Sequence, residues 1–80
     1  MEFAIKYFGI IAEITQKTEE VFFSEEQPIS LKRLQSKIEM TYPKVLVINY
    51  SIAVNQKFLQ NDILLKNGDV IALLPAFAGG

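Results

Sequence analysis

A tight turn followed by an apolar strand stands at residues 67–75, which read Asn-Gly-Asp-Val-Ile-Ala-Leu-Leu-Pro. Gly68 tolerates the positive φ that a tight reversal needs, so we predict a turn there and a strand over 70–74. Alternation gives this strand two largely apolar faces, one with Ile71 and Leu73 and the other with Val70, Ala72 and Leu74. One helix can cover only one face of a sheet, so the other face is left to a partner or to loops of the same chain.

Two further strands are predicted near the N-terminus. Phe3, Ile5 and Tyr7 alternate with small or charged residues, which is typical of a half-buried strand. A second strand is expected at 19–23, after a stretch at 10–15 that could hold a helical turn. These two strands are expected to pair as a hairpin.

One amphipathic helix is predicted over residues 30–41. Its apolar residues recur at spacings of three and four and so share one face: Leu31, Leu34 and Ile38. Ser30 is the expected N-cap, with Ile29 and Leu34 at the positions of a hydrophobic staple. Beyond the helix we expect a loop at 45–48, a strand at 51–55, a turn at Gln56-Lys57 and a brief pairing segment at Phe58-Leu59.

This order of elements predicts an α+β domain, a mixed sheet with one main helix packed on one face. The β-grasp (ubiquitin-like) roll is the economical fold for it. The domain is expected to span residues 1–75, followed by an extended, flexible C-terminal tail at 76–80 that carries Gly79-Gly80.

The missing residue types narrow the possible functions. The chain has 80 residues, with no His and no Cys, which excludes imidazole bases, thiolate nucleophiles and metal sites built on either. The pairs Glu19-Glu20 and Glu25-Glu26 are not expected to form a catalytic dyad, because neighbours on a strand point to opposite faces. We expect them on a solvated edge or loop that discourages aggregation. Catalysis would therefore need a partner.

Charge and hydropathy exclude two classes of partner. The formal net charge is -1 and no basic face stands out, so nucleic acid is not an expected ligand. No apolar stretch approaches the ~20 residues that span a bilayer, and the first residues lack the features of a signal peptide. We therefore expect a cytoplasmic chain without a membrane partner.

The last residues are either a frayed end or a working group. From Pro75 to Gly80 the chain can extend roughly 20 Å, enough to reach the active site of a neighbouring protein, and two glycines fit a narrow channel. The α-carboxylate is a poor electrophile at neutral pH and needs outside activation, as in an acyl adenylate. A sulfur nucleophile would then have to come from a partner, because the chain has no Cys.

Three segments resemble a known family. They are Tyr7-Phe8-Gly9 followed by Glu13, Ala53-Val54-Asn55-Gln56, and Asn67-Gly68-Asp69-Val70 leading through Leu74-Pro75 to Gly79-Gly80. This pattern is similar to the sulfur-carrying small subunit of molybdopterin synthase, the MoaD-type carriers of the MoaD/ThiS ubiquitin-like family. The β-grasp fold of that family agrees with the fold predicted from the elements.

The resemblance implies a role for the tail. An ATP-dependent, E1-like adenylating enzyme would activate Gly80, and a sulfur donor system would convert it to a thiocarboxylate. The sulfur would pass to cyclic pyranopterin monophosphate in molybdenum cofactor biosynthesis. The large subunit would supply the catalytic side chains in a heterotetramer, so this chain would be a carrier that binds no metal or cofactor itself. Besides Gly80, the residues expected to contact partners are Gly79, Ala78, Phe77, Pro75, Leu74 and Phe8.

Two positions depart from the usual pattern of that family. Ala76 stands where many members carry a second proline, which could loosen the tail. Ala12 stands where many carry an arginine, which puts one ionic partner contact in doubt. Three alternatives stay open: a thiamine-pathway sulfur carrier, a ubiquitin-like modifier that joins its terminus to lysines, and a β-grasp interaction module with an idle tail.

Overall fold

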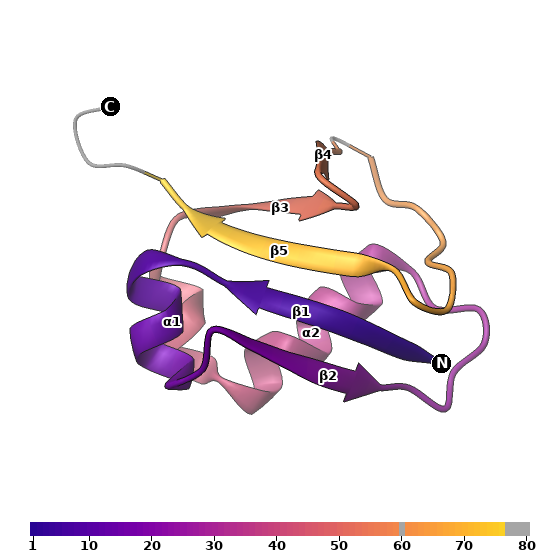
Figure 1. Cartoon of the computed structure of the whole chain (residues 1–80), viewed down its shortest axis with the longest axis horizontal. Coiled ribbons are helices and arrows are strands. Elements are labelled where there is room, and N and C mark those ends of the chain that lie inside the picture. The colour runs from indigo at the N-terminus through magenta and orange to yellow at the C-terminus, as the bar shows by residue number, and fades with distance from the viewer. Residues whose placement is uncertain (60, 77–80) are drawn as a thin grey trace.

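A mixed sheet with one long helix packed across it makes up the molecule (Figure 1). The structure is a computed structural model that describes residues 1–59 and 61–76. Within these residues the elements are β1 (Glu2–Tyr7), α1 (Gly9–Thr15), β2 (Glu19–Phe23), α2 (Leu31–Thr41), the 3-10 helix η1 (Pro43–Val47), β3 (Tyr50–Val54), β4 (Lys57–Phe58) and β5 (Val70–Pro75). In this part of the chain, every helix is too short or too polar to cross a bilayer.

The last strand lies at the centre of the sheet, in the order β2-β1-β5-β3-β4. β5 runs parallel to β1, with Leu73 beside Tyr7, and antiparallel to β3, with Leu73 beside Ile52. β1 and β2 form the antiparallel pair expected from the sequence, and β4 pairs antiparallel with β3. The predicted α+β fold is confirmed as a β-grasp roll with a mixed sheet and a helix on one face.

Alternate residues of the two central strands face α2 and form the core. Ile5 of β1 and Ile71 and Leu73 of β5 are fully buried, and Leu34 and Ile38 of α2 pack in the same cluster. Burying one such side chain contributes about 1.5–3 kcal/mol. A shift of β5 by one residue would turn these side chains out of the core, so the core fixes the register of the central strand.

The start of α2 is fixed by the predicted cap. The Ser30 hydroxyl oxygen accepts a hydrogen bond from the Arg33 amide at 3.1 Å, which satisfies one of the unpaired donors of the first turn. Ile29 and Leu34, the two residues of the predicted staple, are each only 1% exposed. The sequence signals for this helix are therefore confirmed at both levels, cap and apolar face.

The connection after α2 differs from the prediction. Residues 45–48 were expected to form a loop, but Pro43–Val47 form the 3-10 helix η1. Pro43 stands in its first turn, where a missing amide donor costs nothing, and the Val45 amide donates to the Tyr42 carbonyl at 3.0 Å. Val45 is fully buried, so one inward apolar residue holds this short helix against the core.

The β3–β4 hairpin is shifted by one residue from its predicted position. β3 begins at Tyr50 rather than at Ser51, and the brief partner strand is Lys57–Phe58 rather than Phe58-Leu59. The turn residues are Asn55 and Gln56, with φ of 51° and 70°, instead of Gln56 and Lys57. Two consecutive residues with positive φ match the right-handed twist of the strands.

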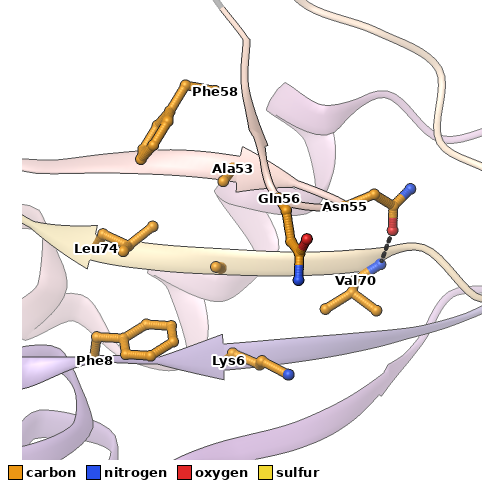
Figure 2. Close-up of a pocket in the computed structure, with 9 residues that line it drawn as sticks. Lys6, Phe8, Ala53, Asn55, Gln56, Phe58, Val70 and Leu74 are labelled. Atoms are coloured by element: carbon orange, nitrogen blue, oxygen red, sulfur yellow. Dashed lines mark hydrogen bonds between the residues drawn. The ribbon is translucent and has the colours of Figure 1, made fainter.

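Asn55 also ties this turn to the start of β5. Its side-chain carbonyl accepts from the Val70 amide at 3.0 Å, drawn in Figure 2, and its side-chain amide donates to Asp69 Oδ1 at 3.0 Å. The turn before β5 contains Gly68 at a φ of 88°, as the sequence predicts. The motif segments around Asn55 and Gly68 therefore contact each other, and these contacts are structural.

Candidate functional site

A groove of about 550 Å³ runs along the face of the sheet that α2 leaves open (Figure 2). β5 lies along its middle, β1 lies on one side, and the β3–β4 hairpin lies on the other. The described residues that line it are Lys6, Phe8, Ala53, Asn55, Gln56, Phe58, Val70, Ala72 and Leu74. The second apolar face predicted for the last strand is thus an open surface, because the hairpin borders the groove without closing it.

Aromatic side chains border the end of the groove toward which β5 runs. Figure 2 shows Phe8 and Phe58 on opposite sides of the strand that carries Leu74. Phe8 comes directly after β1 in the chain and is 44% exposed, and Phe58 of β4 is 66% exposed. Among the described lining residues Lys6 alone carries a charge. Such an aromatic, weakly charged concave surface is the composition found at the centres of protein–protein interfaces.

The strand that lines this groove leads directly toward the C-terminal residues. Pro75 pairs with Tyr50 at the end of β5, and the Ala76 amide donates to the Asn49 carbonyl at 2.9 Å. Of the predicted site residues, the structure brings Phe8 and Leu74 together in the groove, with Pro75 next in sequence. The predicted tail residues Phe77, Ala78, Gly79 and Gly80 lie outside the described residues, so their roles stay predictions.

Sequence reasoning missed two lining residues with clear physical signals. From the sequence, Phe58 is expected only in a pairing segment. An aromatic residue this close to a tight turn lies at the edge of the sheet, where it cannot be fully buried in the core. Lys6 occupies the outward position of β1, beside Ala72 of β5, and its alkyl chain can cover apolar surface while its ammonium stays in water. The positions of both residues beside the groove can be derived once the order of strands is known.

A cluster of polar side chains lies on the helix side of the sheet, opposite the groove. Glu20 Oε2 accepts hydrogen bonds from the hydroxyls of Tyr7 at 2.5 Å and Tyr42 at 2.6 Å, while Lys17 Nζ donates to Oε1 at 3.1 Å. The rings of Tyr7 and Tyr42 meet edge to face with centroids 5.9 Å apart. Glu20 was expected on a solvated edge or loop. β2 is an edge strand, as expected, but Glu20 pairs with Ile5 and therefore lies on the inward face of the sheet rather than in solvent.

The pKa values in this cluster reflect both burial and the hydrogen bonds within it. Burial opposes ionisation of Glu20, but the hydrogen bonds from Tyr42, Tyr7 and Lys17 outweigh it and lower its pKa below the usual range. Burial first, and then the Glu20 carboxylate, raise the pKa of Tyr7, and the pKa of Tyr42 is raised in the same way. The carboxylate therefore stays ionised and the phenols stay protonated.

The other perturbed groups also bind one another. Burial and a hydrogen bond to Glu39 raise the pKa of Tyr50 to about 12, and its hydroxyl donates to Glu39 Oε2 at 2.6 Å. Arg33 and Glu26 form an exposed ion pair at 3.0 Å. In residues 1–59 and 61–76, no three side chains of His, Cys, Asp or Glu converge as metal ligands would.

Known proteins of similar sequence and fold include sulfur-carrier proteins and their relatives. The model of the ThiS family matches residues 5–80. The complex of subunits 1 and 2 of molybdopterin-converting factor from Helicobacter pylori contains a chain with 28% sequence identity and a TM-score of 0.71, and the match covers 100% of both chains.

Two archaeal structures share the fold at lower identity. Molybdopterin converting factor subunit 1 from Pyrococcus furiosus has a TM-score of 0.87 at 22% identity, covering 96% of this chain and 99% of that one. The small archaeal modifier protein 1 from Methanosarcina acetivorans has a TM-score of 0.79 at 20% identity, covering 99% and 96%. The family match over nearly the whole sequence, together with the fold, shows that this chain belongs to the ThiS family of ubiquitin-like sulfur carriers.

Proposed function

We propose that the chain is the sulfur-carrying small subunit of molybdopterin synthase, with the carboxyl group of Gly80 as the carrier site. The observation that supports this most directly is the course of β5. One strand lines the apolar groove and then leads, through Pro75 and Ala76, toward the Gly-Gly residues. A partner that docks on the groove therefore stands next to the point where the tail begins.

The chemistry of the carrier site follows from the carboxyl group. Its oxygen attacks the α-phosphorus of ATP on an adenylating partner, and pyrophosphate leaves. Sulfur supplied at the hydrosulfide level then attacks the carboxyl carbon, AMP departs with the electron pair of the broken C–O bond, and a thiocarboxylate remains. From Ala76, residues 77–80 can extend at most about 14 Å, so each partner must bring its reactive group within that distance of Ala76.

The large subunit of the synthase is the proposed acceptor complex. The Helicobacter pylori protein that resembles this chain is in complex with subunit 2 of molybdopterin-converting factor, which supports a partner of that kind. The proposed docking contacts are Phe8, Phe58 and Leu74, which present an apolar surface beside the start of the tail. The sulfur acceptor bound by the large subunit would be cyclic pyranopterin monophosphate.

A thiamine-pathway sulfur carrier is the second candidate, and the ThiS family match favours it as much as the first. The two functions share the activated Gly80 and differ in the protein that accepts the sulfur. Purified large subunit of molybdopterin synthase and purified thiazole synthase should therefore be tested side by side for binding to the full chain by calorimetry. Tight binding to the large subunit alone supports the proposal, and tight binding to thiazole synthase alone reverses it.

The carrier step itself is tested with a chain that lacks Gly80. Full-length and truncated chains are incubated with an adenylating enzyme, ATP and a sulfide source, and their intact masses are compared. We expect one oxygen to be replaced by sulfur in the full chain only, with circular dichroism unchanged by the truncation. Equal sulfur incorporation in both chains would contradict a role for the Gly80 carboxyl group.

A further inference from the structure

The first residue of α1 lies against the last residue of β5. Gly9 has a φ of 55°, and a Cβ atom built on it would come within 2.9 Å of Pro75 Cγ and 3.8 Å of Pro75 Cδ. Ordinary contacts between carbon atoms are about 3.5–4.0 Å, so a side chain at position 9 would force Pro75 Cγ or the backbone around Gly9 to shift. The missing side chain of Gly9 thus makes room for Pro75.

The end of β5, at Pro75 and Ala76, has contacts on two sides, one toward β3 and one toward α1. On the β3 side, the Ala76 amide donates to the Asn49 carbonyl. Hydrogen-bonded and non-hydrogen-bonded pairs alternate along an antiparallel ladder, so the Pro75–Tyr50 pair is of the non-hydrogen-bonded kind and the ring nitrogen of Pro75 points away from β3. The missing amide donor of Pro75 therefore costs no bond to β3.

On the other side, β1 has already ended. Its last partner in β5 is Leu73, opposite Tyr7, so two residues of β5 run on beyond the last β1–β5 pair. The start of α1 takes the place of β1 there, and Figure 1 shows this helix beside the end of β5. Gly9, the first residue of α1, lies beside Pro75 there.

We propose that Gly9 is a positioning residue that sets, through Pro75, the direction in which the tail leaves the sheet. This inference rests on the proposed carrier function, because the direction matters only if residues 77–80 must enter the active site of a partner. Pro75 is stiff, with φ fixed near -65°, so a shift of its backbone changes the direction in which the chain continues at Ala76. A misplacement of about 1 Å at a reacting group can cost about 100-fold in rate.

The chain offers a matched control for a substitution at Gly9. Gly68 also has a positive φ, 88°, but nothing lies within 4 Å of a Cβ built on it. Gly9→Ala and Gly68→Ala therefore introduce the same side chain into the same strained backbone region, and only Gly9→Ala meets Pro75. Backbone strain should cost both variants a similar, small amount of stability, about 1–2 kcal/mol.

The kinetic test uses the adenylating enzyme with each full-length chain as the varied substrate and pyrophosphate exchange as the readout. Docking on the groove should be unaffected, so we expect Gly9→Ala to lower kcat by about tenfold or more while KM changes less than about twofold. Gly68→Ala should change neither value by more than about twofold. A general loss of folding would instead reduce the active fraction of both variants alike. Equal kinetic values for the two variants overturn the proposal.

A second variant isolates the contact itself. Pro75→Ala removes the ring atoms that a side chain at position 9 would strike. If Gly9 acts through that ring, Gly9→Ala in the Pro75→Ala background should lower kcat by less than about twofold, relative to Pro75→Ala alone. A tenfold loss that persists in this background overturns the proposal.

A structural readout separates this proposal from the proposed function. Exchange of the Ala76 amide proton with solvent, measured by NMR, should be faster in Gly9→Ala than in Gly68→Ala, because the bond to Asn49 depends on the position of Pro75 and the loss of global stability is similar in the two variants. Equal exchange in the two variants overturns the positioning role. If wild type is not adenylated at all, the proposed function fails, and the exchange measurement still decides what Gly9 does.

Discussion

At the scale of single residues, a cluster of hydrogen bonds around the Glu20 carboxylate lies away from the groove. Glu20 is placed inward by the two-residue period of β2, yet it accepts hydrogen bonds from Tyr7, which is 2% exposed, and from Tyr42. A carboxylate on an inward face is tolerated when donors replace the water it loses. Lys17 contributes the opposite charge from the solvent side. The cluster joins β1, β2 and the residue that follows α2.

Removing the Glu20 carboxylate should destabilise the fold. In Glu20→Ala the hydroxyls of Tyr7 and Tyr42 lose their common acceptor, and a buried donor without a partner costs about 1–3 kcal/mol. The measurement is the free energy of unfolding by urea. Glu19→Ala is the control, because Glu19 is the adjacent exposed residue of the same strand, and its effect should stay within about 0.5 kcal/mol. Equal effects of the two variants would contradict the role given to Glu20.

The same cluster predicts a dependence of stability on pH. The pKa of Glu20 is lower in the folded chain than the ordinary value of about 4.3 in the unfolded chain, so its contribution is complete above that value. As the pH falls through the folded pKa, the unfolded chain has already bound its proton and the contribution disappears. The free energy of unfolding of wild type should therefore fall from pH 6 toward pH 3 more steeply than that of Glu20→Gln. Parallel curves for these two chains, with Glu19→Gln as a charge control, would show that the carboxylate is not stabilised by folding.

At the scale of elements, the sequence predicts those helices and strands whose position depends on residues close to one another in the chain. β2 has the bounds that its apolar and β-branched residues indicate, and α2 follows its apolar spacing and the Ser30 cap. The open face of β5 is also predictable, because Val70, Ala72 and Leu74 alternate with the core residues. These features depend on neighbours within a few residues, so a single sequence contains them.

Other features depend on contacts between distant residues. The Glu20 cluster joins positions 7, 20 and 42, and no local pattern indicates that two tyrosines will reach one carboxylate. The β3–β4 turn lies at Asn55 because Asn55 also bonds to Val70, fifteen positions later in the chain. The contact between Gly9 and Pro75 depends on the parallel pairing of the first and last strands. Such contacts appear only when the strand order is known.

The cap of α2 gives a prediction at this scale. Ser30→Ala removes the acceptor of the Arg33 amide and should lower the free energy of unfolding by about 1 kcal/mol. Ser36→Ala, at an exposed position inside the same helix, should be neutral or stabilise by up to about 0.5 kcal/mol, because Ala is the better helix former. Urea unfolding of the two variants tests this. A Ser30→Ala chain as stable as Ser36→Ala would show that the cap contributes nothing.

At the scale of the whole molecule, the two faces of the sheet have separate roles. The face toward α2 holds the fully buried residues and stabilises the fold. The opposite face carries the groove, with exposed aromatic residues at the end where β5 leads to the tail (Figure 2). Substitutions on the open face can therefore weaken docking without unfolding the chain. This separation allows the proposed interface to be tested with simple truncations.

Two exposed phenylalanines on that side of the molecule provide the test. Phe8 lines the groove and is 44% exposed, whereas Phe23 lies on edge strand β2 outside the groove and is 67% exposed. An aromatic hot-spot residue costs about 2 kcal/mol or more when it is truncated to alanine, and about 1.4 kcal/mol is tenfold in affinity, so Phe8→Ala should weaken binding to the large subunit by about tenfold or more. Phe23→Ala should change the dissociation constant by less than about twofold, and both chains should unfold within about 0.5 kcal/mol of wild type. Calorimetric titration measures both constants. If Phe23→Ala weakens binding as much as Phe8→Ala, the docking surface extends to the β2 edge and is not the groove beside the tail.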